Sequence, residues 1–428
     1  MLNRLDLRGK TGDLRGVLPR PHAATEPPVA HVQALLAEVR ERGDDAVRDL
    51  TEKFDGVRVE QLRVPQSEID AALASIPPLL REALEVAKAN ILSYHREQLH
   101  EEARHERDGL VVRELRRPVD RAAVYVPGGL APLISTVLMT VIPARVAGVP
   151  EVVLVSPPDK AIGTISPGIL AAAALAGVDE VYRINGPAGI GAVAYGTETI
   201  RPVDVVVGPG NVYVSQAKRE VSGVVGIPSS FAGPSEVVVI ADETTPAEYA
   251  AIDLIVQIEH GPDGLAWLIT WSEDVAERIL GVIGNLIENN PRREVIAANI
   301  EANSYVAIVD GPEHAIEVAN AIAPEHLQLM TADPESLLPL VRHAGAVFTG
   351  AYAPASVGDY VAGPSHVLPT YGSARFAGAL RVDDFSKYVH VVSVDEPTLA
   401  KLAPHVMALA EAEGLEAHAE SVRLRTPR

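Results

Sequence analysis

The segment Gln257-Ile258-Glu259-His260 carries side chains that can bind a metal ion. The apolar spacing from Ala247 to His260 predicts an amphipathic helix. Residues at positions i and i+3 project from one face of a helix, so Gln257 and His260 can direct an oxygen and an imidazole to one point. The pair is half of a metal site with mixed nitrogen and oxygen ligands. The alternative is a histidine that only ends the helix, because Gly261-Pro262 follows and a positive charge there suits the helix dipole.

A glutamate and a histidine stand side by side in Ala323-Pro324-Glu325-His326-Leu327, at the start of a predicted strand. Neighbours on a strand point to opposite faces, but at its very beginning both can face a crevice. A histidine with an unperturbed pKa of about 6.5 can take a proton at neutral pH, and a glutamate can activate water. The pair predicts general-base chemistry; an exposed Glu-His pair at a strand edge is the alternative.

Further candidate acids and imidazoles lie towards the C-terminus. Asp359 falls within residues 350–375, which are rich in Gly, Pro and Ser and have little periodicity. So long an irregular segment is typical of a functional loop, and an Asx turn is the alternative for Asp359. Glu413 and His418 close the last helical stretch, where a solvated helix end is the alternative.

The turn Gly208-Pro209-Gly210-Asn211 lies between a predicted strand and a predicted helix. Its glycines let the backbone approach a ligand closely, and Asn211 sits near a helix N-terminus, where anions are favoured. A helix N-cap is the alternative role for Asn211. No strand is followed by G-x-G-x-x-G, and the glycines of residues 186–191 have the wrong spacing, so the dinucleotide fingerprint is missing.

Composition narrows the class of protein. The 428 residues suggest two to four domains, and a hydrophobic content of 47% with 22% charged residues allows a large core. Only 5 Phe and 2 Trp occur, so aliphatic side chains fill that core, as in buried parallel sheets. The formal net charge of -20 disfavours nucleic acid as a partner. Cysteine is absent, which excludes disulfides, thiolate ligands and a cysteine nucleophile.

No apolar stretch suits a signal peptide or a membrane span, so we expect a cytoplasmic protein without a membrane partner. Two long helical patterns, 29–54 and 67–94, precede two sets of alternating strands and helices. The predicted strands are 122–126, 151–156, 180–184 and 203–208 in the first set, and 236–241, 265–270, 305–309, 326–330 and 346–349 in the second. This βαβα rhythm predicts an α/β fold with two parallel sheets of Rossmann type.

The chain resembles the histidinol dehydrogenase family in motifs that run along nearly its whole length. They are Tyr125-Val126-Pro127-Gly128-Gly129, Gly208-Pro209-Gly210-Asn211, Ala232-Gly233-Pro234-Ser235-Glu236, Gln257 to Pro262, Pro324-Glu325-His326-Leu327, Gly358-Asp359-Tyr360, His366-Val367-Leu368-Pro369-Thr370 and Glu413 to His418. Each motif alone is weak, whereas all of them in this order form a highly specific match.

The resemblance implies a homodimeric enzyme that converts L-histidinol to L-histidine through L-histidinal, in two NAD-dependent oxidations that form the last step of histidine biosynthesis. It implies one zinc ion per subunit, with the ligands Gln257, His260, Asp359 and His418. The substrate would contact those four residues and also Ser235, His326 and Glu413. The positions that contact NAD would be Tyr125, Ala188 and Asn211; the family has a glutamine at Ala188, and alanine cannot make its side-chain hydrogen bond.

The resemblance also implies two aldehyde-dehydrogenase-like lobes and a tail that reaches the partner subunit. The expected division is an N-terminal arm (1–28), an NAD-binding lobe (122–235), a metal and substrate lobe with N-terminal helices (29–121 plus 236–375) and a C-terminal tail (376–428). Glu413 and His418 would then complete the neighbour's site.

The expected catalytic residues are Glu325 and His326. Without a cysteine nucleophile, the aldehyde must be oxidised as its hydrate, so Glu325 is the candidate to activate water and His326 the base for the hydroxyl proton. The metal would serve chiefly as a template for substrate. Two alternatives are a zinc-dependent hydrolase and a catalytically weakened paralogue that binds metal and histidinol-like ligands.

Overall fold

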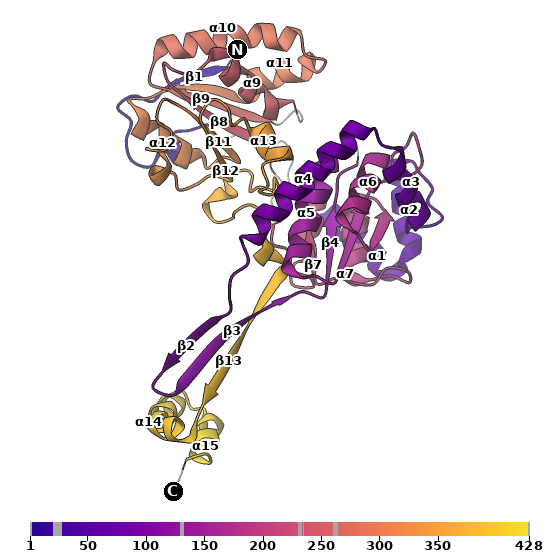
Figure 1. The fold of residues 1–428 in the computed structure, drawn as a ribbon, viewed down its shortest axis with the longest axis vertical. Coiled ribbons are helices and arrows are strands. Elements are labelled where there is room, and N and C mark those ends of the chain that lie inside the picture. The colour runs from indigo at the N-terminus through magenta and orange to yellow at the C-terminus, as the bar shows by residue number, and fades with distance from the viewer. Residues whose placement is uncertain are drawn as a thin grey trace.

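The computed structural model describes residues 2–19, 28–128, 132–229, 233, 235–259 and 264–426. Within these ranges the chain forms two lobes, each built on a parallel sheet covered by helices, and a stalk that projects away from both lobes (Figure 1). The two helix-covered parallel sheets confirm the predicted α/β class. Among the described residues, no helix is both long enough and apolar enough to cross a membrane.

The four-stranded lobe has the strand order β6-β5-β4-β7. Its strands are β4 (Arg121–Tyr125), β5 (Glu151–Ser156), β6 (Glu180–Arg183) and β7 (Val205–Val207). Helices α5 (Ile134–Ala147), α6 (Pro167–Ala176) and α7 (Gly186–Tyr195) connect successive strands, and α8 (Val212–Val221) follows β7. The order reverses between β4 and β7. In parallel sheets, ligands bind at such a reversal, outside the carboxyl ends of the strands.

Four N-terminal helices cover both faces of this sheet: α1 (Val29–Arg42), α2 (Asp44–Asp55), α3 (Gln66–Ser75) and α4 (Pro78–Arg96). The prediction of two long helices is wrong, because Gly43 adopts a φ of 55° and the chain is extended before Pro77-Pro78, where the α conformation is disfavoured. The assignment of these helices to the metal and substrate lobe is also wrong. Apolar side chains of α1 and α2 pack with α7 and α8, and those of α3 and α4 pack with α5 and α6.

The six-stranded lobe has the strand order β1-β10-β9-β8-β11-β12. Its strands are β1 (Asn3–Asp6), β8 (Glu236–Ala241), β9 (Leu265–Thr270), β10 (Ser304–Ile308), β11 (His326–Met330) and β12 (Ala346–Thr349). Helices α9 (Ala247–Ile258), α10 (Glu273–Glu288) and α11 (Arg293–Asn303) cover one face, and α12 (Pro312–Ile322) covers the other. The N-terminal arm is therefore not separate, because its residues 3–6 pair with β10 as an edge strand.

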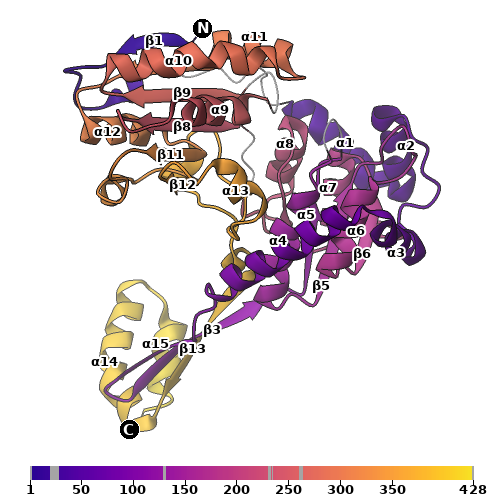
Figure 2. The same cartoon turned by 45° about the horizontal axis from the view of Figure 1, so that its top comes forward.

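The stalk is a three-stranded antiparallel sheet of β2 (Ala103–Arg107), β3 (Leu110–Pro118) and β13 (Ser386–Val394). Asp108 and Gly109 form the two-residue turn between β2 and β3, both with positive φ, as the Asp-Gly pair favours. The helices α14 (Glu396–Ala412) and α15 (Glu416–Arg423) cap its far end, away from both lobes in both views (Figures 1 and 2). The predicted tail is thus a stalk that also includes residues 103–118.

Candidate active site

The predicted catalytic pair lies at the amino edge of the six-stranded sheet. His326 is the first residue of β11 and pairs in register with Val237 of β8. Glu236 begins β8, and Gln257 lies near the end of α9, which leads back to the start of β9. Because the strands are parallel, their first residues share one edge, which places Glu325, His326 and Gln257 on the same side of the lobe.

The imidazole of His326 has polar partners on both ring nitrogens. Nδ1 lies 3.1 Å from the carbonyl oxygen of Glu236 and 3.5 Å from Oε2 of Glu325, and Nε2 lies 3.4 Å from Oδ1 of Asp359. Burial acts to lower the pKa of His326, but the carboxylates of Glu325 and Asp359 outweigh it and raise the pKa to about 10. With Nδ1–H donating to the carbonyl of Glu236, the second proton of the ring sits on Nε2 beside Asp359. His326 would act as a base at neutral pH when a bound cation offsets these carboxylate charges and so lowers its pKa.

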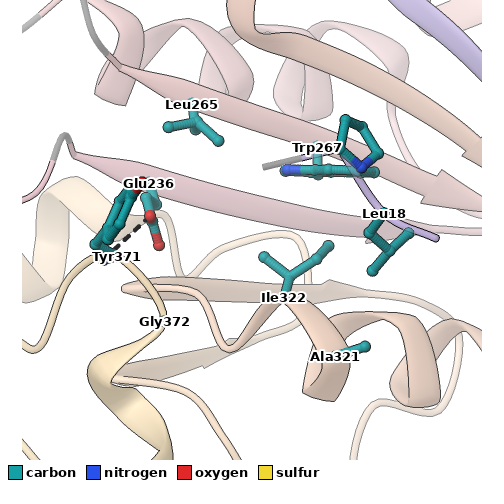
Figure 3. A pocket seen from close by; sticks show the side chains of 9 residues that line it. Leu18, Glu236, Leu265, Trp267, Ala321, Ile322, Tyr371 and Gly372 are labelled. Carbon is teal, nitrogen blue, oxygen red and sulfur yellow. Dashed lines mark hydrogen bonds between the residues drawn. The ribbon is translucent and has the colours of Figure 1, made fainter. Parts of the chain in front are cut away.

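A buried glutamate behind His326 was not predicted from the sequence as a site residue. The backbone N–H of Glu236 donates to Oε2 of Glu325 at 3.1 Å, and its carboxyl Oε1 accepts from the backbone N–H of Tyr371 at 3.1 Å (Figure 3). Burial first, and then the charge of Glu325, raise the pKa of Glu236 to about 8. Its side chain borders a small cavity of about 50 Å³ with Trp267 and Leu18 (Figure 3). Through its backbone N–H and carbonyl, Glu236 therefore contacts both members of the predicted catalytic pair.

Asp359 is held beside His326 by a histidine from the following loop. Asp359 lies in the short helix α13 (Ala355–Tyr360), and its carbonyl oxygen lies 2.8 Å from Nδ1 of His366. Nε2 of His366 lies 2.9 Å from Oγ1 of Thr136, a residue of α5 in the four-stranded lobe. This chain of contacts links the two lobes across the site and agrees with a structural role for His366.

The four predicted zinc ligands are only partly brought together. Gln257 is 2% exposed, and its Nε2 has no hydrogen-bond partner among the described residues. Asp359 lies beside His326, whereas His260 falls outside the described residues. His418 lies in α15 at the end of the stalk, remote from both lobes (Figure 2). Among described residues, no three His, Asp or Glu side chains form a metal-sized group. The predicted ligands offer imidazole nitrogen and carboxylate and amide oxygen, a set that suits zinc without thiolates.

The remaining predicted substrate contacts also lie in two places, one in the six-stranded lobe and the others on the stalk. Ser235 directly precedes β8 at the amino edge of the sheet, and its carbonyl accepts from the backbone N–H of Leu265 at 2.9 Å. Glu413 ends α14 on the stalk and is exposed, like His418. Within one chain, Ser235 thus lies in the six-stranded lobe, whereas Glu413 and His418 lie at the end of the stalk, far from both lobes.

A second cavity, of about 520 Å³, opens at the carboxyl ends of β4, β5 and β6. Its lining residues are Asp55, Tyr125, Pro127, Gly128, Leu133, Pro157, Asn185, Gly186, Pro187, Gly210, Asn211, Val214 and Arg292. Tyr125 and Asn211, both predicted to contact NAD, therefore face one space. Arg292 reaches it from the six-stranded lobe, where its Nη1 donates to the carbonyl of Glu259 at 2.6 Å. The cavity thus lies where the two lobes meet.

The turn that carries Asn211 is fixed from two sides. A Cβ at Gly208, whose φ is 108°, would overlap the carbonyl oxygen of Tyr125, so only glycine allows this approach. The buried ammonium of Lys218 donates to the carbonyls of Gly208 at 2.9 Å and Ser229 at 2.7 Å. Burial lowers the pKa of Lys218 to about 8. Asn211 itself caps α8, since its Oδ1 accepts from the backbone N–H groups of Tyr213 and Val214.

The position where the family has a glutamine lies beside this cavity and not on its wall. Ala188, in the first turn of α7, is 1% exposed and packs in the apolar core shared with α1 and α2. Its neighbour Pro187 lines the cavity. A direct contact between position 188 and NAD stays a prediction.

Comparison with known proteins agrees with this arrangement. Residues 18–426 match the family model of histidinol dehydrogenase. The histidinol dehydrogenase of Bacillus cereus (strain ATCC 10987 / NRS 248) is 46% identical over 396 residues, which are 92% of each chain. That of Parasynechococcus marenigrum (strain WH8102) is 45% identical over 425 residues, 99% of this chain and 94% of its own. The crystal structure of histidinol dehydrogenase from Elizabethkingia anophelis superposes with a TM-score of 0.94 at 35% identity, covering 99% of this chain and 98% of that one. The chain therefore belongs to the histidinol dehydrogenase family.

Proposed function

We propose that this protein oxidises L-histidinol to L-histidine in two NAD-dependent steps, with Glu325 and His326 as its catalytic residues. Family membership gives the overall reaction and its place in histidine biosynthesis. The observation that carries the residue roles is the contact of Nε2 of His326 with Asp359, while Nδ1 and Glu325 are held by the backbone of Glu236. Neither the hydrolase nor the weakened paralogue is favoured, because the match covers nearly the whole chain and the catalytic pair is intact.

The first oxidation requires one base. Nε2 of His326 takes the hydroxyl proton of histidinol while hydride leaves the same carbon for NAD, and histidinal remains. The carbonyl of Glu236 keeps the Nδ1 proton in place, so the ring can accept a proton only at Nε2. Positioned general bases of this kind typically contribute about 10²–10⁴ in rate.

The second oxidation requires water. Oε2 of Glu325 is fixed by the N–H of Glu236 at 3.1 Å. Glu325 removes a proton from water as the water oxygen attacks the carbonyl carbon, and His326, still protonated from the first oxidation, returns its proton to the carbonyl oxygen. The product is the hydrated aldehyde, and His326 is again neutral. His326 then takes one diol proton while the second hydride leaves for another NAD, and the carboxylic acid forms. The absence of cysteine makes this hydrate route the consistent one.

The cavity at the carboxyl edge of the four-stranded sheet is the proposed NAD site. Tyr125 and Asn211 line it, and Arg292 brings a guanidinium that suits the diphosphate. No G-x-G-x-x-G occurs, so the Gly208-to-Asn211 turn at the start of α8 takes over the close backbone approach.

Zinc would be held by Gln257, His260, Asp359 and the partner's copy of His418. When bound, zinc would supply a template that holds the substrate, and its charge would offset that of Asp359. The nitrogen and oxygen atoms of this ligand set support the assignment, with Gln257 binding through its amide oxygen. We place the enzyme in the cytoplasm, as expected from its sequence.

The test of the overall reaction is NADH formation with L-histidinol before and after chelation. We expect two NADH per L-histidine, loss of turnover in the metal-free protein and recovery with zinc. Acidification through the histidine range should release the metal, because ligating imidazoles must be neutral. Full turnover in protein shown to be free of metal would contradict the zinc assignment, and NAD-independent turnover would contradict the dehydrogenase.

We further propose a homodimer in which each stalk completes the neighbour's site. The stalk carries Glu413 and His418 away from its own lobes (Figures 1 and 2). Apolar side chains on it are exposed, with Val392 at 65% and Leu409 at 67%, as expected for a surface that a second chain covers.

Complementation tests the shared site. Chains with His326→Ala and chains with His418→Ala should each form inactive homodimers. Refolded together, they should regain about a quarter of wild-type activity, since half the dimers are mixed and each mixed dimer has one intact site of two. The matched control mixes His326→Ala with Asp359→Ala, which damage the same crevice and should recover nothing. Mixed dimers of the first pair without activity would place His418 in its own chain's site.

A further inference from the structure

Asp55 lies in the proposed NAD cavity, although nothing in the family resemblance assigned it a role. It is the last residue of α2 and lines the cavity with Tyr125 and Asn211. Among the described lining residues, Asp55 is the only carboxylate and Arg292 the only cation. A carboxylate repels the phosphates of a dinucleotide, so in the proposed NAD cavity it is expected to bind a hydrogen-bond donor of the ligand.

The carboxylate of Asp55 is oriented by one amide. Nδ2 of Asn185, which follows β6, donates to Oδ1 at 3.1 Å and to Oδ2 at 3.2 Å. A carboxylate has about four lone-pair positions, so each oxygen can accept a further hydrogen bond after Asn185 is satisfied. Two adjacent acceptors of this kind match the two neighbouring hydroxyl groups of a ribose.

Folding stability does not explain the placement of Asp55. A negative charge at the C-terminal end of a helix is disfavoured by the helix dipole. Burial, which outweighs the hydrogen bond from Asn185, raises the pKa of Asp55 to about 6. A folded-state pKa above the unfolded value means that ionised Asp55 lowers the free energy of unfolding at neutral pH. A carboxyl group that costs stability in a ligand cavity is expected to serve the ligand.

The position of α2 indicates which half of the dinucleotide Asp55 meets. The nicotinamide half must face His326, in the six-stranded lobe. Helix α2 lies on the far side of the four-stranded lobe in both views, and Asn185 follows β6, the edge strand (Figures 1 and 2). Arg292 enters from the six-stranded lobe. The Asp55 end of the cavity therefore suits the adenosine half.

We propose that Asp55 binds the 2′- and 3′-hydroxyl groups of the adenosine ribose and thereby selects NAD over NADP; the inference rests on the proposed NAD site. In Rossmann proteins an acid after the second strand binds this ribose. Here β5 ends at Ser156, and the first acid after it, Asp159, accepts from the backbone N–H of Ala161 at 2.7 Å and is not part of the cavity wall. The acid in the cavity comes from α2 instead. The 2′-phosphate of NADP would meet the carboxylate of Asp55, and like charges repel.

The test measures nucleotide affinity directly, by calorimetric titration of the zinc-loaded full chain with NAD, NADP and 2′-deoxyadenosine NAD. In Asp55→Asn we expect the Kd for NAD to rise roughly tenfold to a hundredfold, as for the loss of hydrogen bonds to a charged group. The Kd for NADP should stay level or fall. The wild type should bind the 2′-deoxy analogue more weakly than NAD, whereas the variant should bind both alike.

The matched control is Asp49→Asn. Asp49 lies on the same helix but is exposed, pairs with Arg42 and is not part of the cavity wall. Its removal should leave all three Kd values unchanged. Urea unfolding of Asp55→Asn should show a stability equal to or above that of the wild type at pH 7.5, because a costly charge is gone.

Two outcomes overturn the assignment. If the ratio of the NAD and NADP dissociation constants is the same in Asp55→Asn as in the wild type, Asp55 does not bind the ribose hydroxyl groups. An equal loss for all three nucleotides together with lower stability would make Asp55 a structural residue. Both would leave the proposed function intact if the wild type forms NADH from L-histidinol. A wild type that forms none would overturn the proposed function, and the Asp55 assignment with it.

Discussion

The side chain of Asn211 caps a helix and is also a proposed contact to NAD. Different substitutions of Asn211 can remove one of these two interactions and keep the other. Its Oδ1 accepts from the backbone N–H groups of Tyr213 and Val214, both at 3.1 Å. These bonds fix the orientation of the amide, because only the oxygen can accept them. The same residue lines the proposed NAD cavity, so Nδ2 is the group that would donate to NAD. The oxygen of Asn211 therefore caps α8, and its nitrogen is the proposed donor to NAD.

The structure sets the size of each effect. Loss of an N-cap side chain costs about 1 kcal/mol of stability, and loss of one neutral hydrogen bond costs roughly 0.5–1.5 kcal/mol, or about two- to twelvefold in affinity. Asn211→Ala loses both contributions. Asn211→Ser keeps the cap and replaces the amide N–H₂ by a hydroxyl on a shorter side chain, which reaches less far into the cavity. Asn211→Asp keeps the cap, gains a favourable charge at the helix N-terminus and adds repulsion towards the diphosphate.

The assay pairs urea unfolding with titration of NAD. We expect Asn211→Ala to lose stability, and Asn211→Ser and Asn211→Asp to stay within about 0.5 kcal/mol of the wild type. All three should bind NAD more weakly, with Asn211→Asp the weakest. An Asn211→Asp protein that binds NAD as tightly as the wild type would refute the contact, and equal destabilisation by all three substitutions would refute the separation of the two roles.

Further predictions concern the catalytic pair, the buried lysine and the departure from the family pattern. Glu325→Gln should slow histidinal oxidation more than histidinol oxidation, whereas His326→Asn should slow both by about 10²–10⁴; equal small losses in separate assays of the two half-reactions would contradict these roles. Burial holds the pKa of Lys218 at about 8, below the ordinary value of about 10.5 for a lysine. Its contribution to the free energy of unfolding should therefore increase by roughly 3 kcal/mol as the pH rises from 8 towards 10.5. Lys218→Met should lack that increase relative to the wild type in urea unfolding across this range. Ala188→Gln should lower the KM for NAD up to about tenfold and leave that for histidinol nearly unchanged; an unchanged or higher KM for NAD would show that position 188 does not contact the cofactor.

The sheets could be predicted from the sequence because the signal for a buried parallel strand is local. Apolar runs such as Glu151–Ser156 and Glu236–Ala241 match the observed β5 and β8, since both faces of these strands are covered. The edge strand Asn3–Asp6 carries mostly exposed side chains and no such run. Its pairing depends on β10, about 300 residues away, which no local pattern reports.

Some of the features that were predicted wrongly are marked by residues in the sequence, and others are not. Gly43 within a helical pattern and Pro77-Pro78 mark the two helix breaks, and Asp108-Gly109 marks the hairpin of the stalk. The lobe on which the N-terminal helices pack is different in kind. An amphipathic helix specifies an apolar face but not the sheet that covers it, so residues 29–96 could be placed only from the tertiary structure.

Some residues of the candidate site could likewise be predicted from the sequence, and others could be found only in the structure. Glu325, His326 and Asp359 carry chemistry in their residue types, and the structure brings these three together. Asp55 and Arg292 carry ordinary charges at helix ends, where a solvated role is the usual interpretation. Their proposed roles come from the cavity that they share, which gathers segments more than 200 residues apart.

The arrangement of the two sheets explains why the reaction needs both lobes. The proposed NAD site lies at the carboxyl edge of the four-stranded sheet, where the chain reverses its strand order and α8 presents its N-terminus. The proposed catalytic pair lies at the amino edge of the six-stranded sheet, where helix C-termini such as that of α9 lie. An anionic cofactor is favoured at the first edge, and a cation at the second. Hydride transfer requires the nicotinamide and the substrate carbon to meet, so the two edges must face one another, and the contact from Thr136 through His366 to Asp359 holds them in that relation.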